Sequence, residues 1–289
     1  VHKIDENNEF SLTDVAEQLK ANRANEWGPL EGDGDFRSDE CVELLQQADI
    51  VVTNPPFSLF REFVTQIFEY EKKFVIVGNK NAITYKEIFP LIMANKCWTG
   101  VTGFSKDLLF IAPANADFSG KAKTSLRTVD GVTLLRSPSI WFTNLDHGRR
   151  HLPISLMTMA ENLKFSRHKQ IRGKKKYDNY DAIEVPFVDA IPSDYTGVMG
   201  VPISFLDKYI PDQFEILGAT QRGCHDAVPD TKKYDDYWEV KQNGEKTGSS
   251  GGKTNENANL VGNDGKKNFF TNKKGRIIQS AYQRIFIKH

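Results

Sequence analysis

The sequence predicts an α/β fold, in which a mostly parallel sheet over roughly residues 1–160 carries helices on both faces and a smaller mixed region follows over 161–289. Three observations support this prediction. Apolar, often β-branched runs alternate with amphipathic segments, as in strand–helix–strand units. The run at residues 50–52 is β-branched throughout, which is typical of a parallel strand covered on both faces. Finally, 39% hydrophobic content in 289 residues is enough to build a large core.

Periodicity and capping residues predict the elements in order. Ser38 is a helix cap, and Val42, Leu44 and Leu45 are expected to face the core. We expect residues 107–112 and 140–144 to pair antiparallel, and residues 268–270 and 281–288 to form a closing hairpin. The predicted helices cover 12–19, 38–47, 58–68 and 85–92, the further predicted strands cover 73–77, 96–101 and 214–218, and a flexible polar insert is expected near 243–263.

Composition limits the class of protein. Lys and Arg together number 38, as do Asp and Glu, so any contact with nucleic acid must come from local clusters of cations. The three cysteines, Cys41, Cys97 and Cys224, are far apart and indicate neither a disulfide framework nor a zinc site. No apolar run is long enough for a membrane span, and the first residues lack a secretion signal pattern. We therefore expect a cytoplasmic protein without a membrane partner.

The main candidate site is the tetrapeptide Asn54-Pro55-Pro56-Phe57, which follows the strand at residues 50–52. The prolines prevent the strand from continuing, so the loop lies at a carboxyl strand end, where α/β sheets bind ligands. The Asn54 side-chain oxygen and the Pro55 carbonyl can accept hydrogen bonds from an exocyclic base amine and localise its lone pair. Phe57 offers a flat face to a base swung out of its duplex. The simpler alternative is an ordinary Asn-Pro turn.

An acidic loop at residues 32–36 precedes this strand. Its glycines permit tight turns, and its carboxylates can accept hydrogen bonds from the amine or hydroxyls of an adenosine. A solvated Gly-Asp turn is the alternative. Too few residues separate Gly34 from Asn54 for a strand–helix–strand crossover of about 30 residues, so this is not the glycine loop of the first sheet strand.

A basic run over residues 167–176 is the candidate DNA contact on a chain that is otherwise neutral. A solvated charged surface is the alternative. We expect no metal site, because His147 and His151 lack a third ligand nearby and Pro153 breaks a helical pattern. The candidate phosphate contacts are Arg167, Lys169, Arg172, Lys174, Lys175 and Lys176.

Seven segments follow one another in a recognisable order: GDGDFRS at 32–38, residues 49–61, KNAITYKEIF at 80–89, WFTNLD at 141–146, YDNYDAI at 177–183, GVMGVPI at 197–203 and RIFIK at 284–288. In this order they resemble the EcoRI-type adenine-specific DNA methyltransferases. The resemblance covers most of the chain and is weak before Trp27, over 103–139 and over 223–274. The chain resembles the family without its N-terminal segment, which carries the cofactor loop, so we expect this chain alone to bind the cofactor weakly.

The resemblance implies a Rossmann-like methyltransferase fold and methyl transfer from S-adenosylmethionine to N6 of an adenine flipped out of double-stranded DNA. It assigns catalysis to Asn54, Pro55, Pro56 and Phe57, and suggests Asp33, Asp35 and Phe36 for the cofactor. It also implies a restriction-modification system, with a restriction endonuclease acting on the same site. We expect a monomer. Two alternatives are a protein-glutamine amide methyltransferase and a truncated, non-catalytic DNA-binding remnant.

Overall fold

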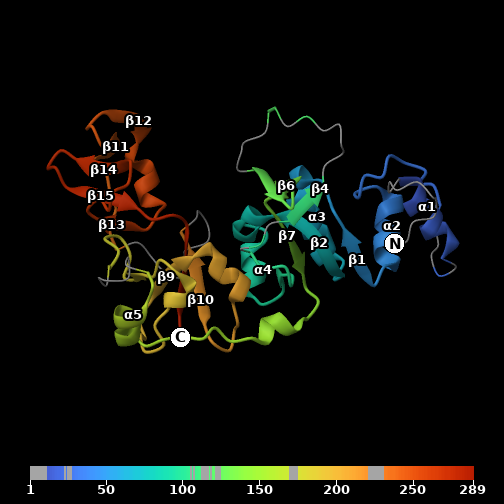
Figure 1. The fold of residues 1–289 in the computed structure, drawn as a ribbon, viewed down its shortest axis with the longest axis horizontal. Coiled ribbons are helices and arrows are strands. Elements are labelled where there is room, and N and C mark those ends of the chain that lie inside the picture. Colours follow the sequence, from blue (N-terminus) through green and yellow to red (C-terminus); the bar gives the residue numbers. More distant parts are fainter. Residues whose placement is uncertain are drawn as a thin grey trace. The chain divides into compact units, whose positions relative to one another are not determined.

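The computed structural model describes residues 12–22, 24, 28–104, 106, 108–111, 117, 119–120, 125–168, 175–220 and 231–289. The chain divides into two compact units, Val1–Ala48 and Asp49–His289. The boundary expected near residue 160 does not separate these units. The assignment of catalysis to residues 1–160 and of DNA recognition to 161–289 stays a prediction. Figure 1 shows the elements along the chain.

The first unit contains two helices, α1 (Leu12–Ala21) and α2 (Asp39–Gln47). The Ser38 hydroxyl accepts a hydrogen bond of 3.3 Å from the Cys41 amide, so the predicted helix cap is confirmed. However, α2 buries none of its residues and Leu44 is 51% exposed. The expectation that Leu44 faces a core is therefore wrong, because periodicity identifies an apolar face without supplying the element that covers it.

The sheet that carries the Asn54 loop has four strands in the order β1-β2-β7-β3. These are β1 (Ile50–Thr53), β2 (Lys73–Asn79), β3 (Trp98–Thr99) and β7 (Ser139–Thr143). β1 and β2 run parallel, but β7 runs antiparallel to both β2 and β3. The expected mostly parallel sheet is thus corrected to a mixed sheet with one parallel pair. Apolar runs predict strands, whereas strand direction depends on how the chain connects them.

β1 pairs only with β2 among the described strands and is an edge of this sheet (Figure 1). Ile50 is 47% exposed and Val52 is 68% exposed. The expectation of a strand covered on both faces is therefore wrong for this chain. A β-branched run reports strand propensity, whereas burial on both faces needs neighbouring elements.

A second sheet has the order β10-β16-β9-β8, and only its β8–β9 pair is parallel. The strand predicted at 214–218 is confirmed as β10. The predicted hairpin of residues 268–270 with 281–288 is wrong, because the closing strand β16 pairs with β9 and β10 instead. The strands are β8 (Ile183–Glu184), β9 (Met199–Pro202), β10 (Glu215–Ala219) and β16 (Arg284–Lys288).

A third, antiparallel sheet takes two of its strands from the expected flexible insert. Its order is β12-β11-β14-β15-β13, so residues 243–263 contribute two strands and the insert is corrected to regular structure. Low-complexity composition does not reveal ladder hydrogen bonds to distant strands. The strands are β11 (Tyr237–Lys241), β12 (Lys246–Ser250), β13 (Asn259–Val261), β14 (Asn268–Asn272) and β15 (Ile277–Ser280).

A fourth sheet has three antiparallel strands in the order β4-β6-β5. β4 pairs with β6 and not with β7, so the expected pairing of 107–112 with 140–144 is wrong. β6 was not predicted, and only Pro138 separates its last residue from the first residue of β7. The strands are β4 (Leu108–Ile111), β5 (Leu126–Val129) and β6 (Val132–Ser137).

The remaining helices are short. The helix expected at 85–92 is reduced to α4, which follows the 3₁₀ segment η2. Pro90 lies in the first turn of α4, where its missing amide hydrogen costs no helical hydrogen bond. Among the described residues, no helix is both long and apolar enough to cross a membrane. The helices are α3 (Phe60–Glu69), α4 (Phe89–Met93) and α5 (Met159–Phe165), and the 3₁₀ segments are η1 (Phe57–Leu59), η2 (Lys80–Thr84), η4 (Gly148–His151), η6 (Val188–Ala190), η7 (Ile203–Lys208) and η8 (Gly251–Asn255).

The main core of the second unit joins the first two sheets. Buried side chains of α3 and β2, such as Phe60 and Ile76, belong to the same cluster as Val201 of β9 and Ile285 of β16. The Phe60 and Phe142 rings lie 5.5 Å apart between centroids. The Asn54 loop therefore lies between an edge strand and a helix whose first residue is anchored in this core.

Candidate functional site

The Asn54 loop leaves β1 and enters α3 through one 3₁₀ turn. Asn54 is exposed and Pro55 is buried, so the side chain of the asparagine projects from a fixed base. The Pro56 carbonyl accepts a hydrogen bond of 3.0 Å from the Leu59 amide, which closes the turn. Phe60 then begins α3 and is 2% exposed. The loop is held from both ends, as a catalytic loop requires.

Two acceptors in this loop are available. No hydrogen bond within the described part of the chain uses the Asn54 side chain or the Pro55 carbonyl. The Phe57 ring is 45% exposed and has no ring partner among the described residues. The loop therefore presents an amide oxygen, a backbone carbonyl and an aromatic face, all without partners in the described structure. From the sequence we predicted that the two acceptors bind the amine of a base and that the aromatic face stacks on its ring.

The neighbouring strand β2 ends at the same edge of the sheet, since it runs parallel to β1 with Thr53 opposite Ile76. Asn79 ends this strand, and its side chain accepts a hydrogen bond of 2.9 Å from the Asn81 amide, which caps η2. The Lys80 ammonium donates to the Phe104 carbonyl at 2.6 Å and to the Lys106 carbonyl at 3.1 Å. These polar groups fix the backbone at this edge.

The acidic loop of the first unit is locally ordered by its own side chains. Asp33 accepts a hydrogen bond of 3.0 Å from the Asp35 amide, and Gly34 has φ +81°, which glycine adopts without strain. The Arg37 guanidinium donates to both Asp35 oxygens and, with its backbone amide, lowers the pKa of Asp35 to about 2. The same guanidinium lies 5.4 Å from the centre of the Phe36 ring. Asp35 is therefore a fixed, ionised acceptor.

The basic run is paired wherever it is described. Arg167 contacts Asp189 at 3.0 Å, Lys175 forms an ion pair with Asp264, and Lys176 contacts Asp181 at 2.6 Å. The hydrogen bond from Lys176 to Asp181 also raises the pKa of the lysine. The sequence did not predict these pairs, because the acidic partners come from other segments of the chain. The role of the run as phosphate contacts stays a prediction. Lys169, Arg172 and Lys174 lie outside the described residues.

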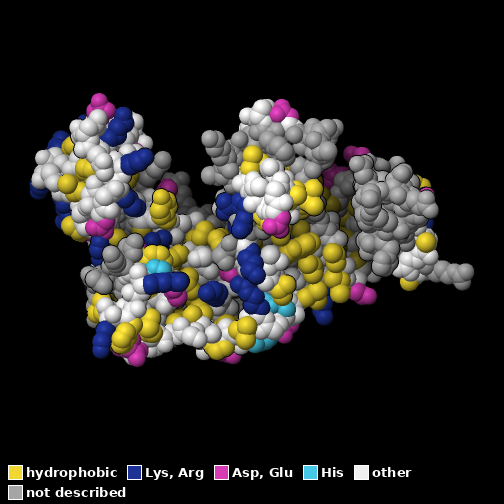
Figure 2. All heavy atoms as spheres, viewed as in Figure 1, with side chains coloured by type: hydrophobic (Ala, Val, Ile, Leu, Met, Phe, Trp, Pro, Cys, Tyr) yellow, Lys and Arg dark blue, Asp and Glu magenta, His cyan; other side chains and the backbone are white. Residues whose placement is uncertain are grey.

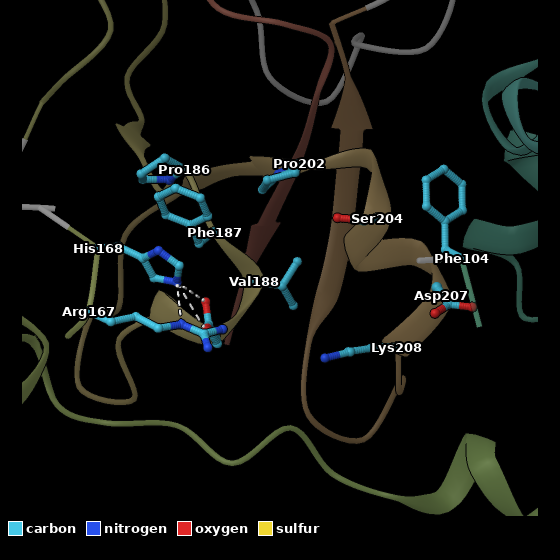
Figure 3. Close-up of a pocket in the computed structure, with 11 residues that line it drawn as sticks. Phe104, Arg167, His168, Pro186, Phe187, Val188, Pro202, Ser204, Asp207 and Lys208 are labelled. Atoms are coloured by element: carbon cyan, nitrogen blue, oxygen red, sulfur yellow. Dashed lines mark hydrogen bonds and ion pairs between the residues drawn. The ribbon is translucent and has the colours of Figure 1, made fainter. Parts of the chain in front are cut away.

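Sequence reasoning missed a pocket of about 480 Å³ in the second unit (Figure 3). It is lined by residues before α5, after α5 and on η7, including Phe104, His168, Phe187 and Lys208. The His168 and Phe187 rings stack with centroids 3.7 Å apart. His168 belongs to the basic run, which was the one signal in the sequence that pointed here. Lys208 lies at the end of η7 and carried no signal.

A family model described as the adenine-specific methyltransferase EcoRI matches residues 1–289. The chain belongs to this family. It is 47% identical over 190 residues to the type II methyltransferase M.EcoRI of Escherichia coli, and this alignment covers 64% of this chain and 55% of the relative. It is 40% identical over 190 residues to the type II methyltransferase M.MpnI of Mycoplasma pneumoniae, and this alignment covers 65% of this chain and 57% of the relative.

A third relative is the type II methyltransferase M.MgeORF184P of Mycoplasma genitalium, at 38% identity over 195 residues, 65% of this chain and 57% of the relative. The matched region spans little more than half the length of each of these relatives. No solved structure matches the chain. Family membership confirms the resemblance seen in the sequence.

Proposed function

We propose that this protein transfers a methyl group from S-adenosylmethionine to the N6 amine of an adenine flipped out of duplex DNA, within a restriction-modification system. The observation that carries the proposal is the Asn54 loop, whose two acceptors and exposed ring have no partners in the described structure. Family membership and three relatives named as type II methyltransferases support it. A cytoplasmic location and a restriction endonuclease of the same specificity are part of this proposal.

The chemistry required of the chain is to make a poor nucleophile reactive. The N6 lone pair of adenine is delocalised into the ring, and two acceptors on the amine hydrogens localise it on nitrogen. The Asn54 side-chain oxygen and the Pro55 carbonyl supply these acceptors, and proline keeps its carbonyl while it restrains the backbone. Since both act on charge that develops at nitrogen, they stabilise the transition state more than the ground state.

Phe57 has a separate role in this proposal. Its ring, 45% exposed at the start of η1, provides a stacking surface for the extruded base. Stacking of a base on an aromatic side chain contributes roughly 1–3 kcal/mol, which offsets part of the cost of unstacking the base from DNA. Pro56 links this ring to the acceptor pair and closes the turn. The tetrapeptide thus binds the base and polarises its amine.

The residues for the cofactor fit only part of S-adenosylmethionine. Asp35 is an ionised acceptor suited to the amine or hydroxyls of the adenosine, and Asp33 and Phe36 lie in the same loop. We propose that these three residues hold the adenosine end. No residue set in the described ranges fits the methionine end as clearly. When bound, the cofactor supplies an electrophilic methyl group.

Protein-glutamine methylation, the other enzymatic alternative, needs a similar loop but finds no support in the relatives, which are all named as type II methyltransferases. A non-catalytic DNA-binding protein is the remaining alternative. Methyl incorporation into duplex DNA, compared with incorporation into a glutamine-containing peptide, separates the three. Incorporation into DNA alone supports the proposal, and binding of DNA without incorporation supports the non-catalytic alternative.

Replacement of Asn54 with Ala is expected to lower methyl transfer by about 10²–10³-fold, by analogy with deletion of one oxyanion donor. DNA affinity should change little, because the lost acceptor acts mainly in the transition state. Asn54→Asp, which keeps an acceptor oxygen, should lose less activity. The measurement is labelled-methyl incorporation together with a DNA-binding titration. Activity of Asn54→Ala within tenfold of the unaltered protein would exclude this role.

A further inference from the structure

A groove in the second unit has features of a phosphate-binding surface. The pocket of about 480 Å³ adjoins a second one of about 370 Å³, since Asp189, Asp207 and Lys208 line both. Arg149 lines the second pocket and Arg167 the first. Figure 2 shows a row of Lys and Arg side chains across the lower middle of the second unit on the face drawn there. We call the two pockets together the Lys208 groove.

The carboxylates of the groove are already neutralised. The Arg149 guanidinium donates to both oxygens of Asp207, and Thr99 adds a hydrogen bond of 2.9 Å to the same carboxylate. Asp189 contacts both Arg167 and His168 at 3.0 Å. Each acidic side chain is thus occupied by a cation or a histidine from the groove itself.

Lys208 remains as the cation in excess. Its side chain has no ion pair or hydrogen bond within the described residues, and it is exposed. In Figure 3, Lys208 and Arg167 reach toward the middle of the pocket from opposite walls, with Val188 between them. Lys208 comes from η7 and Arg167 from the segment after α5, so the fold brings together cations that are distant in sequence. An anion in the groove would meet both.

The form of the groove favours a polymer over a small anion. Two adjoining pockets give it length, and Ser204 adds a hydroxyl donor without a partner in the described structure. Apolar walls, including Phe104 and the Phe187 ring stacked on His168, suit sugars between phosphates. The chain also has no net charge, so contact with DNA must rely on such local surplus.

We propose that the Lys208 groove holds the sugar–phosphate backbone of duplex DNA, with Lys208 as the direct phosphate contact. This inference rests on the proposed DNA methyltransferase function and adds where the duplex lies on the chain. Such contacts position the duplex without reading its sequence. They are expected on every duplex alike.

The test is the salt dependence of DNA binding by the Lys208→Ala variant, measured by fluorescence anisotropy with a labelled duplex. The slope of log K against log salt should fall by about 0.9 for one lost phosphate contact. Lys73→Ala is the matched control. Lys73 is the first residue of β2, an exposed lysine without a partner in the described structure. It should leave the slope unchanged.

The outcomes separate this inference from the proposed function. Lys208→Ala should methylate DNA more slowly at subsaturating DNA, in proportion to its lost affinity, whereas Lys73→Ala should match the unaltered protein. If the slopes of Lys208→Ala and Lys73→Ala are equal while the unaltered protein binds and methylates DNA, the groove proposal is wrong and the function stands. If the unaltered protein neither binds nor methylates duplex DNA, both are wrong.

Discussion

At the scale of single residues, the acidic loop shows how a local contact sets a charge. Asp35 and Arg37 are two positions apart, and one guanidinium engages both carboxylate oxygens. Because the side chain of Arg37 is 53% exposed, the pair adds little to stability, as is usual for surface ion pairs. Its effect is to keep Asp35 ionised and oriented. That is the property an acceptor for an adenosine needs.

Asp35 should therefore remain ionised to unusually low pH. Arg37 lowers the pKa of Asp35 from 3.8 to about 2, so the ion pair favours the folded state above the ordinary carboxyl pKa, and this contribution disappears as pH falls toward about 2. Carboxyl-carbon NMR shifts should show Asp35 still mostly ionised at about pH 3, one unit above that pKa. Arg37→Ala should restore an ordinary titration. A normal Asp35 titration in the unaltered protein would contradict the pair.

At the scale of elements, the Asn54 loop depends on close packing between α3 and the sheet. Gly78 lies in β2, and a Cβ there would meet the Phe60 ring at 2.5 Å and the Phe142 ring at 2.9 Å. Phe60 is the first residue of α3 and directly follows η1. The absence of a side chain at Gly78 therefore lets α3 approach the sheet and determines where the loop ends.

Gly78→Ala should destabilise the protein by about 1–3 kcal/mol, as overpacking of a core does, and should lower methyl transfer through the displaced loop. Urea unfolding measures the first effect and labelled-methyl incorporation the second. Gly148→Ala is the control, since nothing lies within 4 Å of a Cβ at that position. Equal stability of the two variants would mean that Phe60 has room to move.

At the scale of the whole molecule, the described residues contain candidate contacts for only part of the proposed cofactor. In the proposed function, Asp33, Asp35 and Phe36 of the unit Val1–Ala48 hold only the adenosine end. The methionine end of S-adenosylmethionine finds no comparable set in the described ranges. The matched region also spans about 55–57% of the relatives' lengths.

We therefore expect the 289-residue chain to bind S-adenosylmethionine in the millimolar rather than the micromolar range. Loss of half the contacts of a micromolar site, worth about 8 kcal/mol, leaves about 4 kcal/mol, which corresponds to millimolar affinity. Isothermal titration calorimetry of the chain measures this directly. One-to-one binding in the low micromolar range would show that the 289-residue chain holds the methionine end as well, for example through the backbone of Gly32–Gly34.

The sequence by itself determined the family, the Asn54 loop and the pairing of β1 with β2 through α3, because these depend on local patterns of apolar, capping and proline residues. Tertiary structure alone decided the direction of β7, the exposure of Val52 and the partners of Lys175 and Lys176. It also placed Lys208 and Arg167 in the walls of one pocket. Strand direction, burial and ion pairing depend on segments far apart in sequence, and no local pattern records which of them meet.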